Sequence, residues 1–573
     1  MMATPKEIFL ELLKQDGKPE RALVQYEALA VQIPDPVFLY LREGSRPGVT
    51  IKDKWGVTIL FPEGDPGPTP LITPDNKVCP DITRWREYVH APDIEADCQK
   101  GWEPFIGMGR AAAGEDKLLT AFWPTGLFEQ CHFLMGFEDT LANFYEHPQE
   151  MHELIDYLTE FRLKYAEMLI DKLQPDAILS HDDWGAKEAL FMSPDMWREF
   201  FKEPYRKIYQ YIRSRGVVAI HHADSYLAPI VEDMAEIGIQ VWQGVLPEND
   251  IPALQQRLKG SMVLMGGIGA AIDRPDSTEE EIRAYVKQAL DAYCPGGHFI
   301  PCITYGGPGT VFPHVNPIID EEIRAYNQRV HMPANEAAAV PRRRRQAEKT
   351  ADTASASADD NTGVLQAISA ALCKGQKKKV LTLSEEALQT GYSAQSILSD
   401  GLVLGMTRLG EEFTAGRAFV PEMLMAARCM NAATERLKPL LTGQDGSAAG
   451  RVCLGTIKGD MHDIGKNLVK IMMEGCGLEV IDLGTDVSPE TFVQTAVEKK
   501  CDIIACSSLL TTCMMEMKQV VVLAEREGIR DKVKIMVGGA PITQAFCDEI
   551  GADAYTDDAA QAARTAVELL SAG

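Results

Sequence analysis

One stretch in the second half of the chain restricts how everything around it can fold. Residues 332–361 are rich in Ala, Pro, Ser, Thr and charged residues, and they show no apolar periodicity. Such a segment cannot bury a face against a core, so we expect a flexible linker over residues 331–361. The run Arg342–Arg345 within it could bind an anion, although a solvated linker is the favoured interpretation. The linker divides a chain of 573 residues, too long for one core, into parts of ordinary domain size.

Charge and composition exclude several classes of partner. The formal net charge is −26, which disfavours nucleic acids and anionic membrane surfaces because both need a cationic face. The chain has no uninterrupted apolar run of about 18 residues, the length that spans a bilayer. Its first residues, MMATPKEIFLELLKQDGK, predict an amphipathic helix and not a signal peptide. We therefore expect a cytoplasmic protein whose 13 cysteines are mostly free, buried thiols.

Residues 1–330 alternate amphipathic helical periodicity with short apolar runs, among them DAILSHDDWG, GVVAIHHAD, GIQVWQGV, SMVLMGGIG and GHFIPCITYGGPG. This alternation predicts a parallel sheet, and the length suits a (β/α)8 TIM barrel. In such barrels the chemistry gathers where strands end and loops begin. The residues at these predicted ends are Asp182, Asp183, His221, His222, Asp224, Gln243, Cys302 and Tyr305. One of the adjacent pair Asp182 and Asp183 could equally serve as a structural helix cap.

The two parts after the linker differ in pattern. Residues 362–445 contain four successive segments with helical apolar spacing, separated by Gly or Pro, and predict a small all-α bundle. Residues 446–573 return to βα alternation, with predicted strands RVCLGTI, LEVIDLG, CDIIACSS, VKIMVGG and ADAYT. A doubly wound sheet of this flavodoxin-like or Rossmann-like kind binds its ligand beyond the carboxyl ends of its strands.

Three motifs lie at strand ends in residues 446–573. They are D-x-H-x-x-G (Asp460, His462, Gly465), S-x-L (Ser507, Leu509) and the pair Gly538 and Gly539. A neutral imidazole is a good metal ligand, and its second ring nitrogen usually donates to a carboxylate. Asp460 is placed to accept from His462, and Ser507 could extend this relay. Paired glycines let the backbone approach a flat ligand closely.

These motifs resemble the cobalamin-binding domain shared by methionine synthase, corrinoid methyl carriers and B12-dependent mutases. The resemblance implies a bound corrinoid with His462 as the lower axial ligand of cobalt. It places the remaining motif residues around the cofactor: Asp460, Gly465, Ser507, Leu509, Gly538 and Gly539. A nucleotide-binding flavodoxin-like domain with an incidental histidine is the alternative.

The segment Gly410–Met430, GEEFTAGRAFVPEMLMAARCM, resembles the helical cap of methyl-carrying corrinoid proteins. The resemblance implies that Phe413, Val420 and Met423 contact the upper, reactive face of the corrinoid. Taken alone, such an apolar stripe is more often the core of a bundle. A cap favours a methyl carrier over a B12-dependent mutase, which lacks one.

The runs VVAIHHADSYLAPIVEDMAEIGIQVWQGV and GGHFIPCITYGGPG are similar to the uroporphyrinogen decarboxylase superfamily, which also contains corrinoid-dependent methyltransferases. The arginine pair by which decarboxylases hold their substrate is missing from PERALVQYEALAVQIPD. The methyltransferases often hold zinc through H-x-C and a later cysteine. His221 and Cys302 match two of these ligands, but Ala223 replaces the third. A zinc site, an oxygen-richer site with Asp183, Asp224 or His222, and a metal-free site therefore all stay open.

The resemblance implies a corrinoid-dependent methyltransferase that moves a methyl group from a small methylated donor to cobalt(I) of its own corrinoid. We expect Asp183, His221 and Cys302 to assist the leaving group as acid or metal ligands. An aryl methyl ether is the favoured donor, ahead of a methyl halide, with methylation of a thiol acceptor third. The expected partners are a second methyltransferase acting on tetrahydrofolate or a thiol, and a reductive activator of the corrinoid. A B12-dependent mutase and a carrier with an inert barrel are the alternatives.

Overall fold

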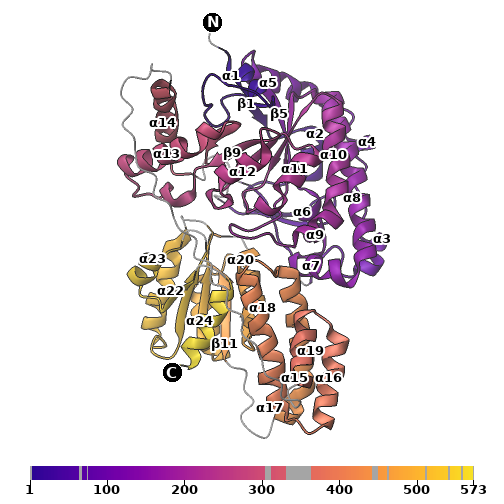
Figure 1. Ribbon diagram of the computed structural model, residues 1–573, viewed down its shortest axis with the longest axis vertical. Helices are drawn as coiled ribbons and strands as arrows, with labels where there is room; N and C mark the ends of the chain where they lie inside the picture. Colours follow the sequence, from indigo (N-terminus) through magenta and orange to yellow (C-terminus); the bar gives the residue numbers. More distant parts are fainter. Residues whose placement is uncertain are drawn as a thin grey trace.

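The computed structural model has three parts, with a large α/β part above a helical bundle and a smaller α/β part that lie side by side (Figure 1). It describes residues 3–63, 67–73, 75–303, 311–330, 363–441, 450–460, 464–509, 513–539, 542–556 and 559–571. The predicted linker, residues 331–361, lies outside these ranges. No helix in the described ranges is long and apolar enough to cross a membrane.

The large part is built on a parallel sheet whose strands neighbour one another in chain order. The strands are β1 (Leu29–Gln32), β5 (Leu118–Trp123), β6 (Ala177–His181), β7 (Val218–His222), β8 (Val241–Val245), β9 (Val263–Gly267) and β10 (Phe299–Cys302). Side chains from all seven strands meet in one inner apolar cluster, so the sheet curves around them into a half-barrel. The predicted parallel βα architecture is confirmed, although the described residues supply seven strands and not the eight of a (β/α)8 barrel.

Helices cover the outside of this barrel and close one of its ends. Helix α1 (Pro5–Leu12) begins at a capping box on Thr4 and buries Ile8, Phe9 and Leu12 in the inner cluster, at the amino ends of the strands. The carboxyl mouth is therefore the end available for chemistry. The other helices are α2 (Pro36–Leu41), α3 (Trp85–Tyr88), α4 (Ile94–Asp97), α5 (Glu103–Ala113), α6 (Leu127–Met135), α7 (Phe137–Glu146), α8 (Pro148–Met168), α9 (Pro194–Trp197), α10 (Glu203–Ser214), α11 (Val231–Ile237), α12 (Ile251–Leu258), α13 (Glu279–Tyr293) and α14 (Val315–Val330).

A small antiparallel sheet also belongs to the large part. Its strands are β2 (Val49–Lys52), β3 (Thr58–Phe61) and β4 (Thr69–Pro70). The turn between β2 and β3 is fixed by the Asp53 carboxylate, which accepts hydrogen bonds from the backbone N–H groups of Trp55 and Val57, both at 2.9 Å.

The helical bundle follows the predicted segments closely. It contains α15 (Gly363–Cys373), α16 (Lys377–Gln389), α17 (Ala394–Ser396), α18 (Leu404–Thr414) and α19 (Val420–Leu441), with a π-helical stretch at Ile397–Val403 joining α17 to α18. The spacing of buried residues such as Leu365, Ile368 and Leu372 explains why this segment is helical and which face it buries.

The smaller α/β part has a parallel sheet of order β12-β11-β13-β14-β15, which is the flavodoxin-like arrangement. Its strands are β11 (Arg451–Thr456), β12 (Glu479–Asp482), β13 (Ile503–Ser507), β14 (Lys534–Gly538) and β15 (Ala554–Thr556). Its helices are α20 (Ile464–Gly475), α21 (Pro489–Lys499), α22 (Met514–Arg526), α23 (Gln544–Ile550) and α24 (Ala559–Ser571). All five predicted strands are confirmed, and chain order reverses between β11 and β13, which is where such folds bind ligands.

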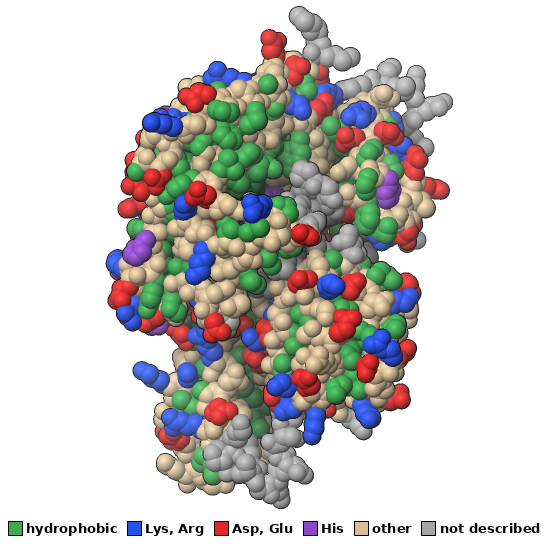
Figure 2. Space-filling view, turned by 180° about the vertical axis from the view of Figure 1, so that it is seen from behind, with side chains coloured by type: hydrophobic (Ala, Val, Ile, Leu, Met, Phe, Trp, Pro, Cys, Tyr) green, Lys and Arg blue, Asp and Glu red, His purple; other side chains and the backbone are tan. Residues whose placement is uncertain are grey.

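The lower parts dock beside the carboxyl mouth of the barrel, because they contact α7, which follows the strand-end helix α6 (Figure 1). Arg428 of α19 pairs with Glu146 at 2.9 Å and Asp139 at 3.2 Å. Lys470 of α20 lies 3.4 Å from Glu138. Figure 2 shows acidic and basic side chains where the large part meets the two lower parts. Helix α20 begins at Ile464, directly after the segment that contains His462 in the sequence.

Candidate active site and corrinoid site

Asp182 organises the carboxyl mouth of the barrel. Its buried carboxylate accepts hydrogen bonds from the backbone N–H groups of Phe128 at 3.0 Å and Glu129 at 2.9 Å, in the first turn of α6. It also accepts from Trp184 Nε1 at 2.9 Å and from the Tyr205 hydroxyl. The alternative that one of the two aspartates caps a helix is confirmed for Asp182.

Glu129, His181 and Asp183 form what we call the acid group. Nδ1 of His181 donates to Glu129 at 2.9 Å, and its Nε2 lies 3.9 Å from an Asp183 oxygen. Burial alone would lower the pKa of His181, but the Glu129 carboxylate raises it to about 10. Burial and the neighbouring carboxylate of Asp224 raise the pKa of Asp183 well above its usual range. His181 therefore carries its proton near neutral pH, and the raised pKa of Asp183 favours the protonated form of that carboxyl.

His222 and Gln243 support this group from the neighbouring strands. The ring of His222 stacks on that of His181, with centroids 4.8 Å apart. Its Nδ1 lies 2.8 Å from Gln243 Oε1, and burial together with the charge on His181 lowers the pKa of His222 to about 3. His222 is thus an uncharged ring that stacks on the charged imidazolium of His181.

His221 and Cys302 are not brought together with Asp183. His221 is fully buried on the outer face of the sheet, where its ring stacks on Trp184 at 4.2 Å and its Nδ1 lies 2.7 Å from the Tyr209 hydroxyl of α10. Cys302 lies in the inner apolar cluster, and burial raises the pKa of its thiol. Their placement does not support a shared zinc site, because His221 faces the outer side of the sheet and Cys302 faces the inner side. The described side chains that could hold a metal ion together are Glu129, His181 and Asp183, whose ligand atoms lie within 4.8 Å of one another.

Sequence reasoning missed Glu129 and His181. His181 is the last residue of β6 and precedes the aspartate pair, so its position at a strand end was a usable indication. Glu129 lies on α6 and reaches the site only through the turn that Asp182 caps, a relation that no local pattern reveals. Tyr305, also expected at the mouth, lies outside the described residues.

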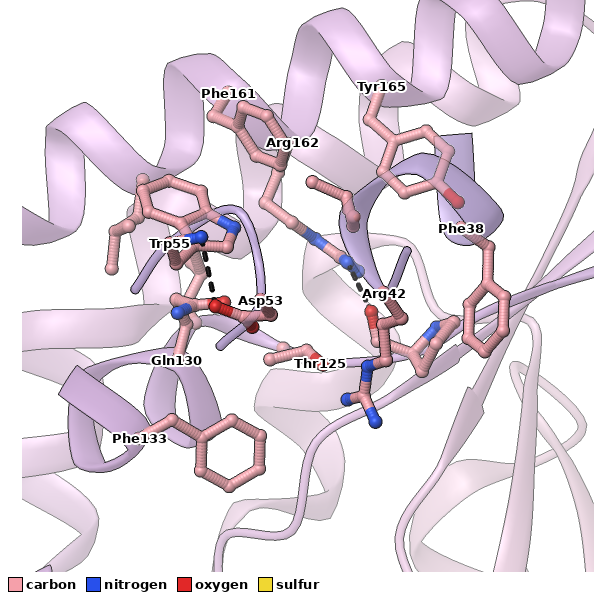
Figure 3. A pocket seen from close by; sticks show the side chains of 15 residues that line it. Phe38, Arg42, Asp53, Trp55, Thr125, Gln130, Phe133, Phe161, Arg162 and Tyr165 are labelled. Atoms are coloured by element: carbon pink, nitrogen blue, oxygen red, sulfur yellow. Dashed lines mark hydrogen bonds between the residues drawn. The ribbon is translucent and has the colours of Figure 1, made fainter. Parts of the chain in front are cut away.

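A small pocket, with a cavity volume of about 40 Å³, opens at the amino end of α6 (Figure 3). Leu127 and Gln130 of α6 line it on one side, and Arg42, Trp55 and Arg162 line it elsewhere. Glu129 lies between Leu127 and Gln130 in sequence, so the pocket and the acid group share one helical turn. Its walls combine aromatic rings with two guanidinium groups, which suits a flat ligand with a polar end.

The corrinoid site is described on both sides of the segment 461–463, which contains His462 and lies outside the described residues. Asp460 is fully buried and accepts hydrogen bonds from Ser508 Oγ at 3.0 Å and the Leu509 backbone N–H at 2.6 Å. The serine that donates to Asp460 is thus Ser508, the residue after the predicted Ser507, whose part in a relay stays a prediction.

The two glycines that end and follow β14, Gly538 and Gly539, differ in the space around their Cα atoms. A Cβ on Gly539, which has φ +129°, would overlap the carbonyl oxygen of Ser508, whereas a Cβ on Gly538 would find its nearest atom at 3.5 Å. Close approach of two strand ends therefore requires glycine at 539. These ends of β13 and β14 lie next to the point of chain reversal between β11 and β13, where such folds bind ligands, and the two glycines present no side chain there.

The remaining predicted cofactor residues lie in different surroundings. Gly465 is exposed in the first turn of α20, next to the segment of His462. Val420 and Met423 are buried in the apolar core of the bundle, and Phe413 packs against that core. Their burial agrees equally with a bundle core and with a lid, so their contact with a corrinoid stays a prediction.

Comparison with known proteins identifies the lower parts. The family described as B12 binding domain matches residues 364–438 and again residues 450–564. A dimethylamine corrinoid protein from Methanosarcina barkeri is 42% identical over 209 residues, which cover 36% of this chain and 98% of the relative. The chain belongs to the corrinoid protein family. This corrinoid protein is also 44% identical over 179 residues to trimethylamine corrinoid protein 1 from Methanosarcina acetivorans, which covers 31% of the chain and 83% of that relative.

The barrel of this corrinoid protein matches the family described as uroporphyrinogen decarboxylase (URO-D) over residues 109–309. Among solved structures, the methanol:cobalamin methyltransferase complex MtaBC from Methanosarcina barkeri aligns with 37% of this chain and 81% of its own, at 27% identity and a TM-score of 0.34. The chain is a fusion of a methyltransferase part with corrinoid-binding parts, and it is a cobalamin-dependent methyltransferase. This result disfavours the alternative of a B12-dependent mutase.

Proposed function

We propose that this protein removes the methyl group from an aryl methyl ether bound in its barrel and passes it to the corrinoid held by the same chain. The observation that carries the proposal is the acid group at the carboxyl mouth, on the side where the corrinoid-binding parts dock. On this proposal the sheet completes a (β/α)8 barrel over residues 1–330, and residues 362–445 form a four-helix cap beside the cobalamin-binding domain, residues 446–573.

The D-x-H-x-x-G segment would hold the corrinoid, with His462 as a ligand of the cobalt and Asp460 as the acceptor of the histidine's second ring proton. Asp460 is already oriented by Ser508 Oγ and the Leu509 N–H, so its carboxylate cannot rotate freely. When bound and reduced, the corrinoid supplies the nucleophile that the methyl carbon requires. Gly539 lets the ends of β13 and β14 approach each other closely beside Asp460.

The acid group would act on the other side of the methyl carbon. An ether oxygen is a poor leaving group, so the C–O bond breaks more easily when a proton reaches the oxygen as the bond opens. His181, held by Glu129, carries a proton at this place, and the raised pKa of Asp183 favours its acid form. A divalent cation held by the same three residues would serve the oxygen as a Lewis acid and is the alternative. A halide leaves without such help, so the acid group favours an ether over a methyl halide.

A methylated amine is the second candidate donor. It is favoured by the names of the dimethylamine and trimethylamine corrinoid proteins that the chain resembles. The carboxylate of Glu129 suits an ammonium cation, whereas the two arginines of the adjacent pocket oppose one.

The test uses full-length protein loaded with cobalamin and chemically reduced. Methoxylated aromatics, dimethylamine and methyl chloride are added separately, and the absorbance of the reduced corrinoid is followed. The proposal expects rapid loss of this absorbance with a methoxylated aromatic, and a large decrease in rate for Asp183→Asn. The control Asp171→Asn changes an exposed carboxylate that pairs with Arg215 on the outside of the barrel, and it should leave the rate unchanged. Reaction with dimethylamine alone would overturn the ether assignment, and silence with every donor would overturn transfer within the chain.

A further inference from the structure

The pocket beside the acid group contains two arginines that the proposed chemistry does not use. They come from distant segments, Arg42 after α2 and Arg162 in α8, and both line the pocket (Figure 3). Leaving-group protonation needs acids, not guanidinium groups, so the arginines require a separate explanation. The following inference rests on the proposed function and names the class of donor.

Arg162 is the stronger of the two observations. Its side chain is almost fully buried, at 5% exposure, and Nε has no hydrogen-bond partner among the described residues. Nη1 donates to the carbonyl oxygen of Pro124 at 2.9 Å, and the guanidinium lies 3.3 Å from the ring centroid of Trp123. A buried guanidinium N–H without an acceptor destabilises the folded protein, and a ligand that supplies an acceptor removes this cost.

The carboxylates around the pocket do not supply that acceptor. Asp53 is engaged by the backbone N–H groups of its own turn. Asp35 accepts from the Tyr165 hydroxyl at 2.7 Å and from the first backbone N–H groups of α2. Asp182 is engaged by the four donors already described, and Glu129 pairs with His181. Each acid that faces the arginines is therefore hydrogen-bonded to other groups.

Arg42 is available for a ligand. It is half-buried, and among the described residues its hydrogen bond is a long one of 3.5 Å to the Pro68 carbonyl oxygen. Asp53 and Glu129 are its nearest negative charges, and both are engaged as described. A planar guanidinium with free donors matches a carboxylate, which can accept two parallel hydrogen bonds.

The pocket carries two further marks of a ligand site. Thr125, which lines it, has φ +62°, a left-handed conformation that is strained for a β-branched residue. Gly126 next to it is required because a Cβ there would overlap the side chain of Asp182. The turn at Thr125 and Gly126 therefore lies both in the wall of the pocket and against Asp182, which positions the acid group. Phe38, Trp55, Phe133 and Phe161 supply flat apolar walls.

We propose that Arg42 and Arg162 bind a carboxylate carried by the methyl donor, so that the donor is an anionic aromatic methyl ether. The carboxylate lies in the arginine pocket, the ring packs against the aromatic walls, and the methoxy group extends toward Glu129, His181 and Asp183. The arginines also exclude a cationic amine from the same place, which gives the site its selectivity.

The test measures binding and is independent of methyl transfer. Cobalamin-loaded full-length protein is titrated with 4-methoxybenzoate and with its uncharged analogue 4-methoxybenzamide, and binding is followed by calorimetry. The inference expects the carboxylate to bind at least tenfold more tightly than the amide. Arg42→Gln and Arg162→Lys should each remove most of this preference, while Arg110→Gln, an exposed arginine on α5, should retain it.

The outcomes separate this inference from the proposed function. Equal binding of the two compounds to the unaltered protein would overturn the inference even if methyl transfer occurs. Retention of the preference in Arg42→Gln and in Arg162→Lys would also overturn it. Inorganic phosphate that binds more tightly than the benzoate and displaces it would identify a phosphate site and overturn it. Preferential binding of the benzoate without transfer of its methyl group would support the inference and overturn the proposed function.

Discussion

Replacing Asp182 by alanine should destabilise the barrel more than any ordinary surface change. The substitution leaves four buried donors without an acceptor: two backbone N–H groups of α6, the Trp184 indole and the Tyr205 hydroxyl. Each costs roughly 1–3 kcal/mol when left unpaired in the interior. The variant also loses a buried carboxylate, whose burial raises the pKa of Asp182 to about 6. Removal of that charge returns roughly 3 kcal/mol, at about 1.4 kcal/mol for each pKa unit. The expected net loss in the free energy of unfolding is therefore about 5 kcal/mol, the middle of the range that these costs allow.

The assay for Asp182→Ala can isolate the barrel without cutting the chain. All 7 tryptophans lie between residues 55 and 242, so the tryptophan fluorescence reports on the barrel alone during urea unfolding. The isosteric Asp182→Asn retains one acceptor oxygen and should lose about half as much as the alanine variant. Asp195→Ala, at a carboxylate whose side chain is 94% exposed, is the control and should change the free energy of unfolding by less than about 0.5 kcal/mol. A loss below about 1 kcal/mol for Asp182→Ala would refute the reasoning that these four bonds organise the mouth.

Three further predictions concern the other parts of the structure. Gly539→Ala should lower the free energy of unfolding by roughly 2–4 kcal/mol and weaken cobalamin binding, because of its φ of +129° and its overlap with Ser508; circular dichroism and cobalamin titration measure the two effects. Arg428→Glu should separate the bundle from α7 and increase the radius of gyration in X-ray scattering, because it places a third acid beside Asp139 and Glu146. Asp35→Asn should flatten the pH dependence of stability, measured by urea unfolding. Burial raises the pKa of Asp35 to about 6, so the folded protein favours the protonated form and loses up to about 3 kcal/mol as the pH rises from 4 to 7.

Each of these predictions has a matched control or a contrary result. Gly538→Ala meets no atom within 3.5 Å and should keep its stability; equal effects at both glycines would contradict the steric account. Arg436→Glu reverses an exposed charge on the same helix that pairs with Glu385 inside the bundle, so it should not change the radius of gyration. For Asp35→Asn, an undiminished fall in stability between pH 4 and 7 would show that other groups cause it.

The sequence predicted the architecture well because its apolar periodicity is strong. Strands such as RVCLGTI and CDIIACSS end in motif residues, and the order of βα units alone indicates that these ends meet at one edge of a sheet. The helical segments after residue 362 likewise followed from spacing. These features depend on local pattern and on the few topologies that parallel sheets allow.

The details of the barrel mouth could not be obtained in the same way. Strand β7 ends in His221 and His222, and both faces of a parallel strand are buried, so alternation does not reveal which histidine faces inward. The structure places His221 against Tyr209 outside the sheet and His222 against His181. Arg42 and Arg162 are 120 positions apart in the chain, and only tertiary packing brings them to one pocket. Long-range convergence of this kind leaves no local pattern to read.

The central claim is that the barrel and the corrinoid of one chain act on the same methyl group. The most direct measurement is the rate of methyl transfer from a saturating methoxylated aromatic to the reduced cobalamin-loaded protein, followed by absorbance over a hundredfold range of protein concentration. Transfer within one chain predicts a first-order rate constant that does not change with protein concentration. A rate constant that rises in proportion to protein concentration would contradict the claim, because the methyl group would then pass between separate molecules.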